Sequence, residues 1–128
     1  MGTFTVEGQA STGKMSVERF AATGEFSIVC QNDEVGLIQL IFKDETDART
    51  PQELTLVERL SSGLKEKKTA DLSFQTFGIG ATVSTRGETT AKVTVTKSSD
   101  GNEVTFSEVP LFSVDRKSQR FVSGKLHY

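Results

Sequence analysis

The chain has no tryptophan, one cysteine, one histidine and two prolines among its 128 residues. Because Cys30 is alone, an intrachain disulfide is excluded, which favours a reducing compartment or an oxidising one in which the fold does without disulfides. Long apolar runs are missing too: the longest, residues 37–42, includes Gln39, so no membrane span is expected. Residues 1–25 hold no continuous apolar stretch, so we expect no signal peptide within the chain. A leader removed during maturation would make the protein secreted or place it in the cell envelope; otherwise it would be cytoplasmic.

A strong excess of either charge is likewise absent. The chain has 15 Lys and Arg against 17 Asp and Glu, a formal net charge of −2. Nucleic-acid-binding domains usually carry a basic excess, so we expect no nucleic-acid partner. The length and the 35% share of hydrophobic residues predict one soluble globular domain over residues 1–128.

What the chain has in abundance is alternation of apolar and polar residues over short segments, which is typical of half-buried β-strands. The clearest pair, residues 93–96 and 104–106, flanks Asp100 and Gly101, and glycine accepts the positive φ that a hairpin turn demands. Pro110 marks a bulge or an edge, because it cannot donate to a ladder. Residues 8–13, with two glycines among small polar residues, are expected to form a loop. The other expected strands are residues 3–7, 15–17, 26–30, 37–42, 71–77, 81–85, 111–114 and 121–128.

One segment carries a helix signal, and it follows an expected charged loop at residues 43–49. Thr50, Pro51 and Glu53 form a capping box with proline at the first helical position. The apolar residues that follow at helical spacing are Leu56, Leu60 and Leu64. We favour a short helix near residues 50–62, with a strand over residues 54–57 as the alternative, since that stretch also alternates.

These elements predict an all-β, mostly antiparallel fold with one short helix near residues 50–62. Strands at short spacing with turns between them favour a β-sandwich, immunoglobulin-like or jelly-roll-like, over a barrel.

The titratable residues suggest no enzyme. His127 falls on the strand face opposite Val122, Leu126 and Tyr128, so we expect it to face solvent without the carboxylate and nucleophile that histidine catalysis needs. Cys30 lies in an apolar run and is expected to be buried rather than reactive. No catalytic residue is predicted.

The best metal candidate is a group of acidic residues in two turns that flank one expected strand. Carboxylates at strand ends can bind Ca²⁺, although their spacing here matches no EF-hand and acidic turns commonly serve only solubility. The five residues are Asp33, Glu34, Asp44, Glu45 and Asp47. Gly78 and Gly80 lack the third glycine and following helix of a dinucleotide-binding loop, so they predict a bend and no cofactor.

The closing residues 121–128, with Ser123-Gly124 followed by alternating residues, and the hairpin before them resemble the end of small bacterial lipoprotein-like β-sandwich domains of unknown function. The resemblance covers about the last forty residues. The chain departs from that family at Cys30, which follows Val29 and has no apolar leader, so it lacks a lipobox. The resemblance implies a bacterial cell-envelope protein and no particular activity.

Together these observations favour a non-enzymatic binding or adhesion-like module for a protein or glycan, secreted or at a bacterial cell surface. The alternative is a structural protomer that forms homo-oligomers through edge strands such as residues 3–7 or 121–128. A small hydrolase that uses carboxylates alone is the third class, disfavoured by the single histidine and single cysteine.

Overall fold

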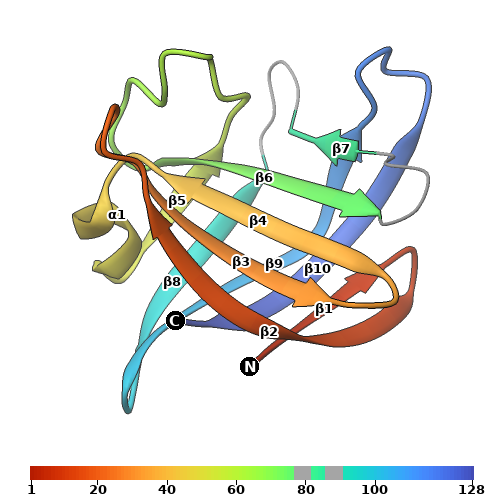
Figure 1. Cartoon of the computed structure of the whole chain (residues 1–128), viewed down its shortest axis with the longest axis horizontal. Coiled ribbons are helices and arrows are strands. Elements are labelled where there is room, and N and C mark those ends of the chain that lie inside the picture. The colour runs from red at the N-terminus through yellow and green to blue at the C-terminus, as the bar shows by residue number, and fades with distance from the viewer. Residues whose placement is uncertain (77–81, 86–90) are drawn as a thin grey trace.

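The computed structural model describes residues 1–76, 82–85 and 91–128, and within them it contains ten β-strands and one short helix (Figure 1). The strands are β1 (Gly2–Val6), β2 (Gln9–Arg19), β3 (Phe26–Asn32), β4 (Gly36–Phe42), β5 (Gln52–Leu56), β6 (Thr69–Thr76), β7 (Thr82–Ser84), β8 (Lys92–Ser98), β9 (Gly101–Phe112) and β10 (Gln119–His127). The helix, α1, spans Glu45–Arg49.

Hydrogen bonds join all ten strands in one sheet, in the order β10-β1-β2-β3-β4-β6-β5-β8-β9-β7. β9 also pairs with β10, which stands first in this order, so the sheet closes on itself. Neighbouring strands are antiparallel except β5 and β6, which run parallel and pair over only two positions. Figure 1 shows β2, β3, β4 and β6 crossing in front of β8, β9 and β10.

Side chains from the inward face of each strand fill the interior. In β4, every second residue from Gly36 to Phe42 is buried, as period-two alternation requires. The rings of Phe4 and Phe74 come from opposite walls and their centroids are 6.1 Å apart. Because packing of this kind fills the space between the walls, a partner has access to the ends and the outer surface of the sheet.

The all-β, mostly antiparallel class with one short helix is confirmed, but the arrangement differs from the expected sandwich. A sandwich has two separately hydrogen-bonded sheets, whereas these strands form one closed sheet. The long strand β9 closes the sheet, because its residues 101–105 pair with β8 and its residues 103–112 pair with β10. Inward and outward residues alternate in the same way in both architectures, so alternation alone could not separate them.

The helix lies earlier in the chain than the sequence predicted. Thr50 is the C-cap of α1 rather than an N-cap, and β5 occupies the first part of the segment expected to be helical, with irregular chain after it. The alternative of a strand there was the better one, because β5 can bury Leu54 and Leu56 on one face while pairing with both β6 and β8. Asp44 caps α1 by accepting a hydrogen bond from the backbone N–H of Asp47 at 2.8 Å. No helix in the described ranges is long and apolar enough to cross a membrane.

The two strands expected to be free edges are both enclosed. β1 lies between β10 and β2, and β10 lies between β1 and β9, so both edges of each strand carry ladder hydrogen bonds. The loop expected at residues 8–13 is reduced to a tight turn at Glu7 and Gly8, which both have positive φ. β2 therefore starts at Gln9 and is longer than predicted.

Gly36 provides a test of this packing. Its φ is +145°, and a Cβ at this position would lie 2.1 Å from the backbone oxygen of Gln75. We expect Gly36→Ala to lower the free energy of unfolding by about 3 kcal/mol or more, because strain and a backbone clash add. The measurement is urea denaturation.

Gly24→Ala is the matched control. Gly24 also has positive φ, +78°, but nothing lies within 4 Å of its added Cβ. It should cost about 1–2 kcal/mol, the price of left-handed backbone alone. Equal effects of the two substitutions would contradict the close approach of β4 and β6 at Gly36.

Candidate functional site

The connection between β5 and β6, residues 57–68, is the longest irregular segment that the structure describes. Its two ends lie side by side at the sheet. The N–H of Val57 donates to the carbonyl of Ala70 at 2.8 Å, and the N–H of Thr55 donates to that of Lys68 at 3.0 Å. A loop of this length whose ends meet is an Ω-loop, a class that often carries function. We call residues 57–68 the crossover loop; Figure 1 shows it in green above α1.

A buried carboxylate holds the middle of the crossover loop. Glu25, in the turn before β3, is 1% exposed. Its oxygens accept two hydrogen bonds from the Arg59 guanidinium, at 2.7 and 2.9 Å, and one from the Leu64 N–H at 2.9 Å. The Thr23 hydroxyl donates a further bond at 2.7 Å. Every oxygen of the carboxylate is thereby satisfied, which a buried charge requires.

The same contacts set the ionisation of Glu25. Burial alone would raise its pKa, but the hydrogen bonds from Arg59, Thr23 and Leu64 and the charge of Arg59 outweigh it and lower the pKa from 4.5 to about 2. Glu25 is therefore an anion at neutral pH and acts as a fixed anchor for the loop rather than as a proton donor.

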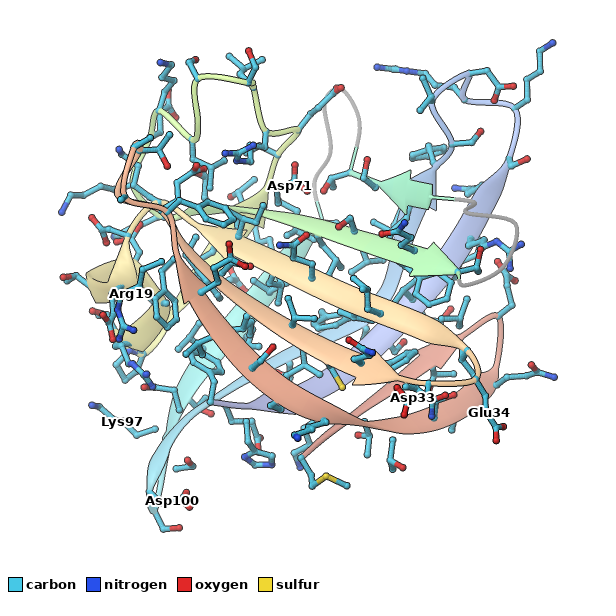
Figure 2. All side chains as sticks on the ribbon, in the orientation of Figure 1. Arg19, Asp33, Glu34, Asp71, Lys97 and Asp100 are labelled. Atoms are coloured by element: carbon cyan, nitrogen blue, oxygen red, sulfur yellow. The ribbon has the colours of Figure 1, made fainter. Side chains whose placement is uncertain are left out.

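Two more carboxylates hold the ends of the crossover loop. Asp71 of β6 accepts a hydrogen bond from the Arg59 N–H at 2.7 Å, and Asp47 of α1 accepts one from the Lys68 N–H at 2.7 Å. Lys68 has a φ of +62°, a conformation that costs a non-glycine residue energy and persists where its surroundings fix it. Acidic residues from three separate elements thus fix one loop; Figure 2 shows Asp71 near the start of β6, beneath the loop.

The fixed loop encloses a pocket of about 270 Å³. Its apolar lining comes from Val57, Leu60 and Leu64, and its rim carries Glu58, Lys65 and Glu66. Leu64 is 6% exposed, whereas Leu60 is 59% exposed, an unusual value for a leucine held in a braced loop. The arrangement can receive one apolar side chain and surround it with charges of both signs.

The five acidic residues considered for Ca²⁺ are divided between the two ends of β4. Asp33 and Glu34 lie in the β3–β4 turn, whereas Asp44, Glu45 and Asp47 lie at α1, beyond the other end of β4. Figure 2 shows Asp33 and Glu34 at the end of the sheet opposite Arg19, the ion-pair partner of Glu45. Asp44 and Asp47 are already used in capping and in holding the crossover loop. Among the described residues, no group of three or more His, Cys, Asp or Glu could hold a metal ion.

His127, in β10, and Cys30, in β3, point to opposite faces of the sheet. His127 faces solvent, as expected, with 48% of its side chain exposed and Nε2 3.0 Å from a Glu103 oxygen. Cys30 is in the core, where burial raises the pKa of its thiol, so it is not poised as a nucleophile. Gly78 and Gly80 lie outside the described residues.

Glu25 and Arg59 were missed by sequence analysis. Their one signal is weak: Glu25 is a lone acid directly before the apolar start of β3, and Arg59 follows β5 by three positions. Neither local pattern predicts that the two residues are in contact, because they are 34 residues apart in the sequence and only the folding of the sheet brings them together.

We expect Glu25→Gln to lower the free energy of unfolding at pH 7 by about 3–5 kcal/mol, because it leaves Arg59 without its anion in a desolvated site. Glu45→Gln is the matched control: Glu45 also binds an arginine through both oxygens, Arg19 at 2.9 Å, but this pair is exposed. Exposed pairs contribute little, so its effect should be small. Chemical denaturation measures both, and similar losses would contradict the anchoring role.

The pH dependence has a definite sign. Because the pKa of Glu25 falls from 4.5 to about 2 on folding, its stabilisation is complete above pH 4.5 and is lost as the pH falls toward 2. The shift corresponds to about 3 kcal/mol. Denaturation of the wild type and Glu25→Gln should therefore differ most near neutrality and converge at low pH; a constant difference would show that Glu25 titrates normally.

Comparisons of the chain with protein-family models, with curated proteins and with solved structures gave no match. The resemblance of residues 121–128 to lipoprotein-like domains stays a prediction.

Proposed function

We propose that this protein is a non-enzymatic binding module, which holds an apolar side chain of a protein partner in the pocket of the crossover loop. The observation that carries the proposal is a half-exposed leucine at the mouth of a pocket whose loop is fixed by three carboxylates. Binding sites are commonly loops held by a rigid scaffold.

The ionic anchoring supports recognition more than stability. A buried ion pair is weak evidence for stability, because the cost of removing two charges from water offsets their attraction. Glu25 does, however, favour one conformation of the crossover loop, since its buried oxygens bind both the Arg59 guanidinium and the Leu64 N–H. A loop ordered before binding loses less conformational entropy when a partner arrives.

The chemistry of the pocket favours a protein partner over a glycan. Its lining in the described residues is aliphatic, without an aromatic ring on which a sugar could stack. The charged rim of Glu58, Lys65 and Glu66 matches the common plan of an apolar centre surrounded by polar residues. Arg116, in the β9–β10 connection, lies 3.9 Å from Glu58 and extends this rim.

The non-enzymatic part of the proposal rests on the state of the reactive groups. The solvent-facing histidine is paired with Glu103, the thiol is buried, and Glu25 is held as an anion by four donated hydrogen bonds. None of these groups faces the pocket as a free acid, base or nucleophile in the described part of the chain.

The test uses the N-acetyl amides of leucine, isoleucine, phenylalanine and lysine as probes in an NMR titration of the labelled protein. We expect the apolar probes to shift amides of residues 57–69 with dissociation constants on the order of millimolar, as suits ligands of this size. The lysine probe should not bind. Leu60→Asp should weaken the apolar probes at least about tenfold, since the lost apolar contact is about 1.5–3 kcal/mol.

Val114→Asp is the matched control. Val114 is also exposed, at 77%, but it lies in the β9–β10 connection and does not line the pocket. Its probe affinities should equal those of the wild type. Binding of the lysine probe, shifts centred away from residues 57–69, or no effect of Leu60→Asp would each overturn the proposal.

A further inference from the structure

β2 has an open edge, because it is more than twice as long as the neighbour on that side. β1 pairs with β2 only from Gln9 to Gly13, and the pairing ends where Gly2 faces Gly13. From Lys14 to Arg19, β2 pairs with β3 on its other edge. This leaves Lys14 to Arg19 as a strand with one unpaired edge within the described residues, at the lower front of Figure 1.

The hydrogen-bond pattern shows which backbone groups are open. Gly13 faces Gly2 of β1, while the oxygen of Thr12 and the N–H of Phe20 bond toward β3 and the turn before it. Backbone groups of successive residues in a strand point to opposite edges. Even-numbered residues therefore bond toward β3, and Met15, Val17 and Arg19 direct their N–H and C=O groups to the open edge.

The side chains along this edge are exposed on both faces of the sheet. Val17 is 44% exposed, although Met15 on the same face packs against the core. On the outward parity, Lys14 and Glu18 are both exposed, carry opposite charges, and take part in no ion pair within the described ranges. An open edge with one apolar residue at its centre and one charge of each sign is complementary to itself.

We propose that two copies of this chain associate by pairing their β2 edges antiparallel, with Val17 on the two-fold axis. In this register Met15 faces the partner's Arg19 and Val17 faces its own copy, so each hydrogen-bonded position uses the open backbone groups. Lys14 and the partner's Glu18 become diagonal neighbours on the outer face, about 7–8 Å apart at Cα and within reach of their long side chains. The two Glu18 side chains are diagonal neighbours at the same spacing, so two opposite-charge contacts outnumber one like-charge contact. A register shifted by two residues toward Gly13 is blocked, because it would place the partner's Arg19 opposite Gly13, where Gly2 already lies. The opposite shift would place the two Glu18 side chains directly opposite each other, and like charges at opposed positions are destabilising.

The interface is small, so the dimer is weak. It adds main-chain hydrogen bonds, one valine contact, two opposite-charge contacts and one contact between like charges, at the low end of the area of specific interfaces. We expect a dissociation constant on the order of 100 µM. The site is distinct from the crossover loop, so failure of one proposal leaves the other standing.

Sedimentation and light scattering over a wide range of concentration test the proposal, with hydrogen exchange at low and high concentration. The wild type should pass from monomer to dimer, and the amides of Met15, Val17 and Arg19 should become protected. Val17→Pro should remain monomeric, because it removes an N–H that the monomer does not use. A monomer at every concentration, or a dimer that survives Val17→Pro, overturns the proposal.

A charge exchange keeps the test decisive if proline disturbs the strand. Lys14→Glu and Glu18→Lys each place like charges across the axis and should weaken the homodimer about fivefold to tenfold. An equimolar mixture of the two variants gives three opposite-charge contacts, two between positions 14 and 18 and one between the two side chains at position 18, and should form a heterodimer at least as stable as the wild-type dimer. If both variants dimerise like the wild type, or the mixture is no better than either variant alone, the β2 edge is not the interface.

Discussion

The short parallel pairing of β5 with β6 is the constraint on which the rest of the structure depends. It joins β4 and β6 on one side of the sheet to β5 and β8 on the other. Parallel strands that follow each other in the chain cannot be linked by a tight turn. The chain must leave after Leu56 and return at Thr69, and these twelve connecting residues form the crossover loop. Closing the sheet therefore creates a long segment with unsatisfied backbone groups near the end of the core.

The carboxylates of Glu25, Asp47 and Asp71 provide acceptors for these backbone groups. Each accepts a hydrogen bond from a backbone N–H of the crossover loop that no ladder satisfies. Glu25 needs a counter-charge once it is buried, and the loop itself supplies Arg59. The parallel pairing in the closed sheet thus requires a long connecting loop, and the backbone N–H groups of that loop require hydrogen-bond acceptors. The three carboxylates are these acceptors, and by binding the loop they also fix the shape of the pocket.

Sequence patterns showed what was local and missed what depends on closure. Alternation identified most strands, and the turn between β8 and β9 was recognised from Asp100 and Gly101, although Gly101 does not adopt the positive φ that the prediction assumed. The segment from Thr50 to Leu64 failed because capping signals and a four-residue spacing of leucines outweighed the alternation of Leu54 and Leu56, and only the two neighbours of β5 decide between them. The ion pair of Glu25 with Arg59 could not be predicted, since its energy comes from burial that neither local sequence reveals.

The open edge of β2 follows from the unequal lengths of neighbouring strands. A ring of strands has no edges when neighbours match in length, but β1 has five residues and β2 has eleven. Proteins commonly protect such an edge with charges, and Lys14 and Glu18 suit that purpose. If these charges served only to prevent pairing, charges of one sign would be more effective, because they would repel the same charges on any other copy of the chain. Opposite charges four residues apart on one face instead leave the proposed antiparallel pairing attractive on balance, because two contacts between Lys14 and Glu18 outnumber one contact between the two Glu18 side chains.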